Sequence, residues 1–171
     1  GGTYTLALGL AGTPAAVERS AADVLSLARL NGATQLKASD SKRVAAVFAS
    51  LGSNAGEALS CRAAVLPTQL PSLIEALSTD DSSPAMVALP TIGILRVSWP
   101  AGSDAPVALR AFHLATTQLS ANATIEHCPS DLRAKFDVFG PLPRSFDLMR
   151  RIKQQFDPNG VLSPGRFVGR L

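Results

Sequence analysis

The apolar residues of this chain recur at two spacings, every three to four residues in some segments and every two residues in others. The first spacing predicts helices over residues 14–30, 41–51, 68–78, 105–119 and 145–156. The second, together with short apolar runs, predicts strands over residues 3–10, 35–39, 60–66, 86–89, 92–99 and 124–127. Because short strands are interleaved with helices, we expect an α+β fold: a layered domain with a largely antiparallel sheet covered by helices, as in a ferredoxin-like repeat.

The boundaries of the first helix are marked by residue type. Thr13 suits the N-cap and Pro14 the first turn, whereas Asn31 and Gly32 favour a stop. The apolar side of this helix should consist of Val17, Ala21, Val24 and Ala28.

Two proline-containing segments are predicted to interrupt regular structure. Pro90-Thr91 lies between two predicted strands, where proline requires a break, a bulge or a sheet edge. Residues 131–143 end in Gly140-Pro141-Leu142-Pro143, so we expect them to form a loop that leaves the domain and leads to the last helix.

The last helix, over residues 145–156, is amphipathic, with Ser145 as its N-cap. Its apolar face should contain Phe146, Met149, Ile152 and Phe156. Because Pro158 disfavours helical geometry at Asp157, the helix should end there, and Asn159-Gly160 should turn the backbone.

Beyond this turn, the sequence predicts a return to a core and then a second turn. Val161 and Leu162 form a short apolar pair that should enter the core. In Ser163-Pro164-Gly165, proline fixes φ and glycine allows another backbone or a flat ligand to come close. The second turn would therefore hold Arg166 in a defined place.

With 171 residues, 46% hydrophobic and 17% charged, the chain is long and apolar enough for one globular domain. Its net charge of +3 is concentrated in residues 144–171, which contain six basic and two acidic residues. We interpret Arg150, Arg151 and Lys153 as the solvated face of the last helix. Without a nucleic-acid-reading motif we expect no nucleic-acid partner, and docking to an acidic partner or an anionic cofactor domain is favoured over it. No apolar run is long enough for a membrane span, and no basic leader precedes a signal core.

The side chains that most often carry chemistry form no recognisable constellation. There is no Ser-His-Asp spacing, no paired acids and no metal-binding helix signature, so we expect no catalytic residue and no metal site. Glu126-His127-Cys128 is interpreted as a strand end with a buried thiol, and Cys61 and Cys128 do not make a disulfide framework. His113 shares a predicted helix face with polar residues and is expected at the surface.

Residues 149–167 carry a motif that resembles a known family. After a helix, the sequence reads Phe-Asp-Pro-Asn-Gly-Val-Leu-Ser-Pro-Gly-Arg-Phe. It resembles the C-terminal signature of FAD-linked oxidases of the vanillyl-alcohol oxidase type, which usually reads F/L-D-P-x-G-I/V-L/M-N-P-G-K/R. Residues 93–97, Gly-Ile-Leu-Arg-Val, resemble the glycine-led strand of the same domain. Within the family, the chain is most similar to the FAD-binding subunit of bacterial glycolate oxidase.

The resemblance implies that residues 1–171 form the C-terminal cap or substrate domain of a larger FAD-dependent 2-hydroxyacid oxidoreductase, with residues 144–171 as its tail helix and loop. The parent would oxidise glycolate or a related acid to the 2-oxo acid within a multisubunit complex. FAD would be held by an N-terminal domain absent from this chain, because residues 9–12 and 52–56 lack the spacing of a dinucleotide or phosphate loop. This fragment alone should not hold the cofactor.

The implied partners are that FAD-binding domain, a catalytic flavin subunit and an iron-sulfur subunit. Through these subunits the protein would be cytoplasmic and peripheral at the inner face of the membrane. The candidate cofactor contacts are Ser163, Pro164, Gly165, Arg166 and Arg96. Either arginine would stabilise an anionic flavin or a carboxylate by charge-assisted hydrogen bonds.

Two departures from the family pattern bear on this function. Related catalytic subunits carry an H-x-G-D-G-N-x-H motif near the glycine-led strand, and residues 88–96 contain none of its histidines. Their absence favours an accessory flavin subunit. The asparagine that often begins N-P-G is Ser163 here, which argues against a defined amide contact at this position.

Two other functions stay open. A free-standing α+β module, binding a ligand or bridging subunits without catalysis, would share only the tail motif and contain no flavin. A hydrolase or transferase would need a nucleophile or base constellation, which the sequence does not provide.

Overall fold

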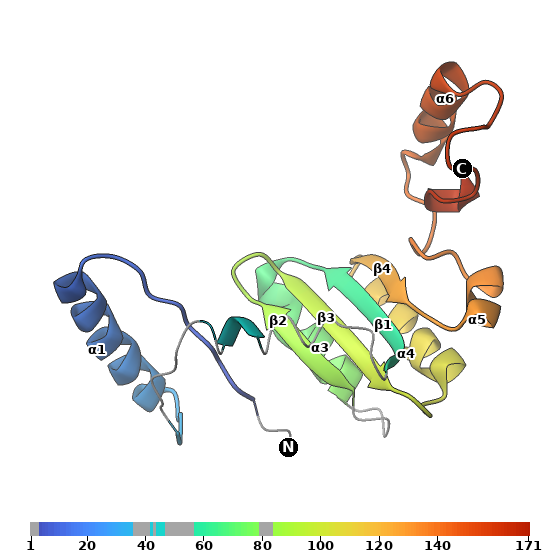
Figure 1. The fold of residues 1–171 in the computed structure, drawn as a ribbon. Coiled ribbons are helices and arrows are strands. Elements are labelled where there is room, and N and C mark those ends of the chain that lie inside the picture. Colours follow the sequence, from blue (N-terminus) through green and yellow to red (C-terminus); the bar gives the residue numbers. More distant parts are fainter. Residues whose placement is uncertain (1–3, 36–41, 43, 47–56, 79–83) are drawn as a thin grey trace. The chain divides into compact units, whose positions relative to one another are not determined.

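The computed structural model describes residues 4–35, 42, 44–46, 57–78 and 84–171. The chain divides into two units, Gly1–Ser53 and Asn54–Leu171 (Figure 1). The sheet and the tail helix both belong to the second unit.

The first unit contains the predicted helix, α1 (Pro14–Leu30). Pro14 occupies its first turn, and Asn31 and Gly32 end it, with a φ of 82° at Gly32. The predicted apolar side is confirmed, because its members are among the least exposed residues of the helix: Val17, Ala21, Val24 and Ala28.

The predicted strand over residues 3–10 is wrong for the part that is described. Residues 4–10 form no strand, and Tyr4, Leu6 and Leu8 are exposed. Alternating apolar residues make a strand only when another strand supplies the ladder of hydrogen bonds, and the described residues of this unit contain none. Of the strand predicted over 35–39, only Gln35 is described and it is not in a strand; of the helix predicted over 41–51, the described residues 42 and 44–46 are helical.

The second unit is built around a four-stranded sheet. In chain order its elements are β1 (Glu57–Ala64), α3 (Leu70–Ser78), β2 (Ala85–Leu89), β3 (Ile94–Pro100), α4 (Ala105–Gln118) and β4 (Asn122–His127). The strands lie in the order β2-β3-β1-β4, and every neighbouring pair is antiparallel. This is the βαββαβ arrangement of a ferredoxin-like repeat, so the predicted fold class is confirmed.

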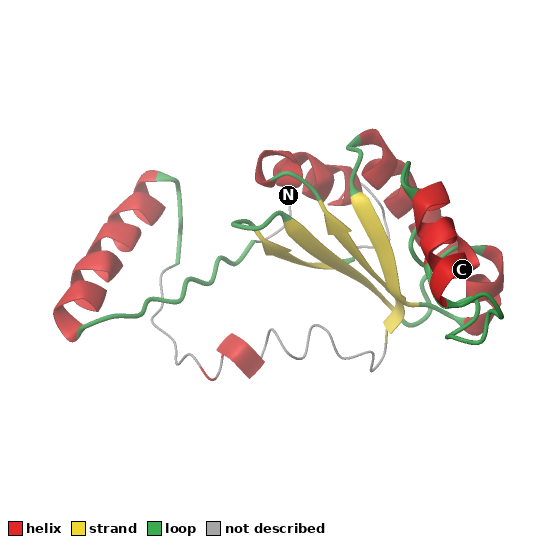
Figure 2. Ribbon diagram, turned by 90° about the horizontal axis from the view of Figure 1, so that it is seen from above, coloured by secondary structure: helices red, strands yellow, loops and turns green. Residues whose placement is uncertain are grey.

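One face of this sheet forms the core with α3 and α4, which lie on the same side of the sheet (Figure 2). Leu59, Cys61 and Ala63 alternate with more polar residues along β1, and Leu95, Val97 and Trp99 do so along β3. Across the sheet–helix interface, the rings of Trp99 and Phe112 meet edge to face with centroids 6.4 Å apart. This alternation leaves the other face of the sheet to residues that include Arg62 and Arg96, although Ser60 is also buried.

The predicted break at Pro90-Thr91 is the turn of the β2–β3 hairpin, which spans residues 90–93. Gly93 ends this turn with a φ of 66°, and its carbonyl oxygen accepts a hydrogen bond of 2.9 Å from the N–H of Val65. A Cβ at this position would collide with the carbonyl oxygen of Val65. Glycine is therefore required here both by backbone conformation and by the close approach of another segment.

The segment after β4 differs from the predicted loop. Residues Ser130–Lys135 form the short helix α5, which buries Leu132 in the core. Pro129 precedes its first turn, where an acidic residue favours the helix, and basic residues occupy the last turn. Only residues 136–143 remain irregular before α6 (Phe146–Phe156) and the closing 3₁₀ turn, Val168–Arg170.

Asp137 connects this irregular segment to the end of the chain. Its carboxylate accepts hydrogen bonds from the N–H of Phe139 at 2.9 Å and from the N–H of Gly169 at 2.7 Å. The rings of Phe139 and Phe167 lie 5.8 Å apart, and Val138 accepts a hydrogen bond of 2.7 Å from Ile125 in β4. The C-terminal turn is thus tied to the segment that runs along the edge of the sheet.

Among the residues that the structure describes, no helix combines the length and the apolar character needed to cross a bilayer.

Candidate functional site

The turn after α6 is organised around the carboxylate of Asp157. This side chain is 2% exposed, and it accepts hydrogen bonds from the N–H groups of Val161 at 2.8 Å and Leu162 at 3.0 Å. Lys153, one helical turn earlier, donates to the same carboxylate at 2.5 Å and also to the carbonyl oxygen of Leu162. One buried carboxylate and one ammonium group therefore close residues 157–162 into a fixed loop.

The electrostatics of Asp157 follow from these contacts. The hydrogen bond from Lys153 is the largest cause that lowers the pKa of Asp157, and the N–H groups of Leu162 and Val161 lower it further, against an opposing effect of burial. The carboxyl group is thus held in its ionised form. The sequence predicted Asp157 only as the end of the helix; the missed signal is an acidic residue followed by Pro-x-Gly, a pattern suited to a side chain that caps nearby N–H groups.

The two predicted turns of the tail are confirmed. At the first, the N–H of Gly160 donates to the carbonyl oxygen of Asp157 at 3.1 Å, with a φ of 63° at Gly160. At the second, the N–H of Arg166 donates to the carbonyl oxygen of Ser163 at 3.2 Å, and Gly165 has a φ of 70°. Proline at the second position and positive φ at the third are typical of a type II turn.

Ser163 itself has an unusual backbone, with a φ of 47° in the left-handed region. Asparagine adopts this region more readily than serine because its side chain can hydrogen-bond locally. An asparagine at this position would therefore have a backbone advantage over serine, independent of any contact with a ligand. Gly165 has open space where a Cβ would stand, so glycine is needed there for its φ.

The predicted return of Val161 and Leu162 to a core is wrong. Val161 is 72% exposed and Leu162 60% exposed, because the loop points their N–H groups inward to Asp157 and leaves their side chains outside. The apolar face of α6 is also largely open, with Phe156 79% exposed. We call the exposed apolar side chains of this region the tail apolar surface: Leu148, Ile152, Phe156, Val161, Leu162 and Phe167.

Arg96, the other candidate contact, lies on β3 and points to the face of the sheet opposite the core, since its neighbours Leu95 and Val97 are buried. Arg62 is directly opposite it on β1. Glu126 on β4 lies 3.5 Å from both arginines, through Nε of Arg62 and Nη2 of Arg96. We call this face, with its two arginines and one glutamate, the open sheet face.

The structure does not join these two candidate regions. Ser163, Pro164, Gly165 and Arg166 are all exposed, and among the described residues the hydrogen bonds of this loop stay within the tail. The ion pair of Arg96 stays on the sheet. Arg96 and Arg166 are therefore each accessible to a ligand or a partner from their own region.

The remaining candidates give no second site. His113, predicted at the surface, is partly buried between Phe112 and Phe136; its Nε2 is enclosed and has no hydrogen-bond partner in the described chain, and burial lowers its pKa. Cys61 and Cys128 are buried free thiols, and burial, followed by the charges of Cys128 and Glu126, raises the pKa of Cys61.

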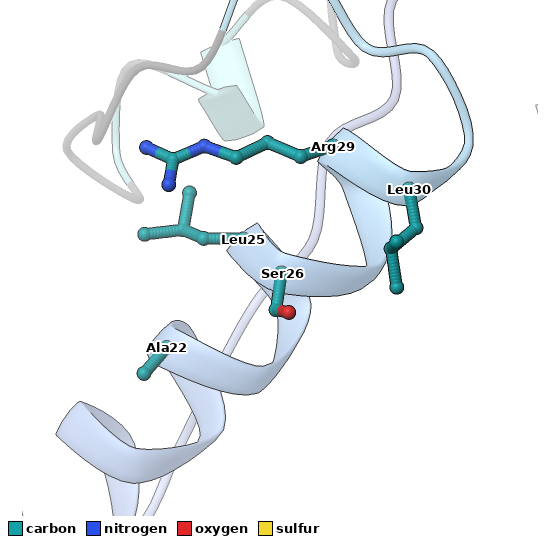
Figure 3. A pocket seen from close by; sticks show the side chains of 5 residues that line it. All are labelled: Ala22, Leu25, Ser26, Arg29 and Leu30. Carbon is teal, nitrogen blue, oxygen red and sulfur yellow. The ribbon is translucent and has the colours of Figure 1, made fainter.

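A shallow hollow on the first unit is lined by α1 alone, through Ala22, Leu25, Ser26, Arg29 and Leu30 (Figure 3). One helix contributes every lining residue and no group of titratable side chains converges there. Within the part of the chain that the structure describes, three or more metal-ligating side chains do not come together anywhere.

Comparison with known protein families finds a match in the tail. Residues 142–167 match the C-terminal domain of the FAD linked oxidases. The matched segment contains α6, the Asp157 loop and the type II turn, and so relates this part of the chain to FAD oxidases. No curated protein and no solved structure matches the chain.

Proposed function

We propose that this chain is the C-terminal domain of an FAD-dependent 2-hydroxyacid oxidoreductase, similar to the FAD-binding subunit of bacterial glycolate oxidase. One observation carries the proposal: the segment that matches the FAD linked oxidases, residues 142–167, contains the loop that Asp157 holds in a fixed conformation. Three N–H or ammonium donors converge on one buried carboxylate, which is more order than a solvated tail requires.

The tail residues fit a contact with a bound flavin. The type II turn exposes the Arg166 side chain, and the space around Gly165 is open to an approaching group. An arginine in such a place would form charge-assisted hydrogen bonds to an anionic group of the cofactor or substrate. FAD would supply the redox chemistry by accepting the hydride from the α-carbon of the hydroxy acid, while the protein sets geometry and electrostatics.

The tail apolar surface supports a further part of this proposal, which is packing against a second domain. Several large apolar side chains exposed around an ordered loop favour an interaction site. We propose that the N-terminal FAD-binding domain of the parent covers it, and that electrons leave through partner subunits. The histidines of related catalytic subunits are missing from residues 88–96, which favours the accessory flavin subunit of such a complex.

The first experiment is to purify the native polypeptide that contains this sequence and to record its mass and its visible absorption spectrum. We expect a longer, yellow protein with flavin absorption, after which glycolate, lactate and related acids are assayed as substrates. A colourless protein of about this length would overturn the proposal and leave a stand-alone binding or subunit-bridging module.

A substitution then tests the role of the turn. In the flavin-containing parent, Arg166→Ala should weaken flavin or substrate binding by about tenfold or more, the usual loss for a charge-assisted hydrogen bond. Arg151→Ala is the matched control, since Arg151 is an exposed arginine on α6 outside the turn. If the two variants have equal flavin content and turnover, Arg166 does not contribute to binding the flavin or the substrate.

A further inference from the structure

Arg62 and Arg96 form a directly opposed pair of like charges on the open sheet face. They occupy paired positions on the neighbouring strands β1 and β3, and their side chains are 43% and 48% exposed. Directly opposed residues of an antiparallel pair have Cβ atoms about 5 Å apart, and like charges at this separation are destabilising. A sheet that keeps two arginines in this relation needs negative charge beside them.

Glu126 supplies only part of that charge. A single carboxylate oxygen, Oε1, lies 3.5 Å from both Nε of Arg62 and Nη2 of Arg96. Charge-assisted hydrogen bonds are usually about 2.7–2.9 Å long, so Glu126 is a loose partner to each arginine. One carboxylate also balances one of the two positive charges, which leaves the cluster with a net positive charge able to receive a second carboxylate.

We propose that Arg62 and Arg96 form a binding site for a small carboxylate, in which Glu126 is the internal competitor that the ligand carboxylate displaces or joins. Arginine suits this role because its planar guanidinium group donates two parallel hydrogen bonds to a carboxylate. The proposal rests on the proposed function for naming a 2-hydroxy acid as the ligand. It adds Arg62 and Glu126 to the site and specifies an anionic substrate.

The surroundings of the pair favour a small molecule over a protein. The neighbouring positions on the same face carry short side chains at Ala64, Ser98 and Thr124 and branched apolar ones at Val87 and Ile94. Four strands of five to eight residues make a face of roughly 400 Å² at the usual strand spacing and rise. A stable protein interface takes about 800 Å² from each partner, so this face alone is too small for one.

Binding can be measured on this chain without flavin. The chain is titrated with glycolate, and with glycolamide as the uncharged control, at about 0.01 M ionic strength, where charges are screened only beyond about 30 Å. The backbone amide signals of residues 62, 96 and 124 are followed by NMR. We expect a millimolar dissociation constant for glycolate, shifts confined to this face, and no binding of glycolamide.

The variants distinguish a binding site from a purely structural charge cluster. Arg62→Gln and Arg96→Gln should each weaken glycolate binding by about tenfold, whereas Glu126→Gln should strengthen it by about threefold because the competing carboxylate is gone. Arg110→Gln, at an exposed arginine of α4, is the matched control and should change binding less than twofold. An unchanged affinity in Glu126→Gln would overturn the proposal, and this variant keeps both arginines should either arginine variant fail to fold.

Two other results would also overturn it. Shifts spread over all basic residues would mean nonspecific ion binding, and a hexaglutamate peptide that binds at residues 62 and 96 when glycolate does not would assign the face to an acidic protein. The outcome is independent of the mass and flavin test above. If the parent protein is yellow but this chain does not bind glycolate, the proposed function stands and the carboxylate site is refuted.

Discussion

The sheet and the tail of the second unit keep their shape by opposite means. The sheet and its helices α3 and α4 bury their large apolar residues against one another, with Leu59, Leu73 and Phe112 fully enclosed. The tail exposes most of its large apolar residues and instead buries a carboxylate, Asp157, under three hydrogen-bonded groups. The sheet and its two helices therefore have a core of their own, whereas the tail has a fixed backbone and an apolar surface suited to a partner.

The largest expected effect compares two phenylalanines. Phe112→Ala should lower the free energy of unfolding by about 3–5 kcal/mol because it removes a fully buried ring from the core. Phe156→Ala, at a side chain that is 79% exposed, should change it by less than about 0.5 kcal/mol in this chain. Denaturant unfolding followed by circular dichroism measures both, and similar losses for the two variants would contradict the division into a self-sufficient sheet and an open tail.

A second pair compares two glycines with almost equal φ. Gly93→Ala should cost about 2–4 kcal/mol, since the left-handed backbone costs about 1 kcal/mol and the collision with Val65 adds a steric penalty. Gly165→Ala should cost only about 1 kcal/mol, because no atom lies near the new Cβ. Thermal unfolding of the two variants measures the stability that each one loses. Equal losses would show that Val65 moves away from the new Cβ of Gly93→Ala at little cost.

Lowering the pH should reduce the stability of the sheet and of the tail loop over different pH ranges. The pKa of His113 is lowered by burial, so the unfolded state binds more protons than the native state below the unfolded pKa of about 6.5, and the sheet loses stability as pH falls below that value. The pKa of Asp157 is also lowered, so its contribution is complete above the unfolded pKa of about 3.9 and is lost as pH falls through the native pKa.

At about pH 5, therefore, the sheet should be less stable than at pH 7 while the tail loop stays closed. Hydrogen exchange of the Val161 and Leu162 amides reports on the loop, and denaturant unfolding reports on the sheet. His113→Leu should flatten the pH dependence of the sheet, and Asp157→Asn should release the two amides without shifting the midpoint of the sheet. Loss of amide protection at pH 5 in the unmodified chain would contradict this separation.

The smallest expected effect concerns the second turn of the tail. Ser163→Asn should stabilise the loop by about 0.5 kcal/mol, because asparagine is several-fold enriched over other residues at positive φ. Ser163→Ala serves as the control, since it keeps the strained backbone without a polar side chain. Amide exchange at Arg166, whose N–H closes the turn, measures both changes, and faster exchange in Ser163→Asn would contradict the backbone explanation.

Most of the fold was predictable because it depends on local and periodic signals. The alternation of helices and strands from residue 57 onward, the hairpin at Pro90 and the two turns of the tail all follow from apolar spacing and from proline and glycine. Two of the errors share one cause, which is dependence on a distant partner. Residues 4–10 have the alternation of a strand and lack a partner among the described residues, and α5 forms where Leu132 can be buried in the core.

The candidate site divides in the same way. The sequence by itself determined the loop at residues 157–166, since its turns need only the conformational preferences of proline, glycine and asparagine. The structure adds that Asp157 is the centre of that loop and that Val161 and Leu162 face outward, although these contacts join residues only four and five positions apart. It alone placed Arg62 opposite Arg96 beside Glu126, because strand register joins residues 30 or more positions apart, and no local pattern specifies which residues a strand will meet.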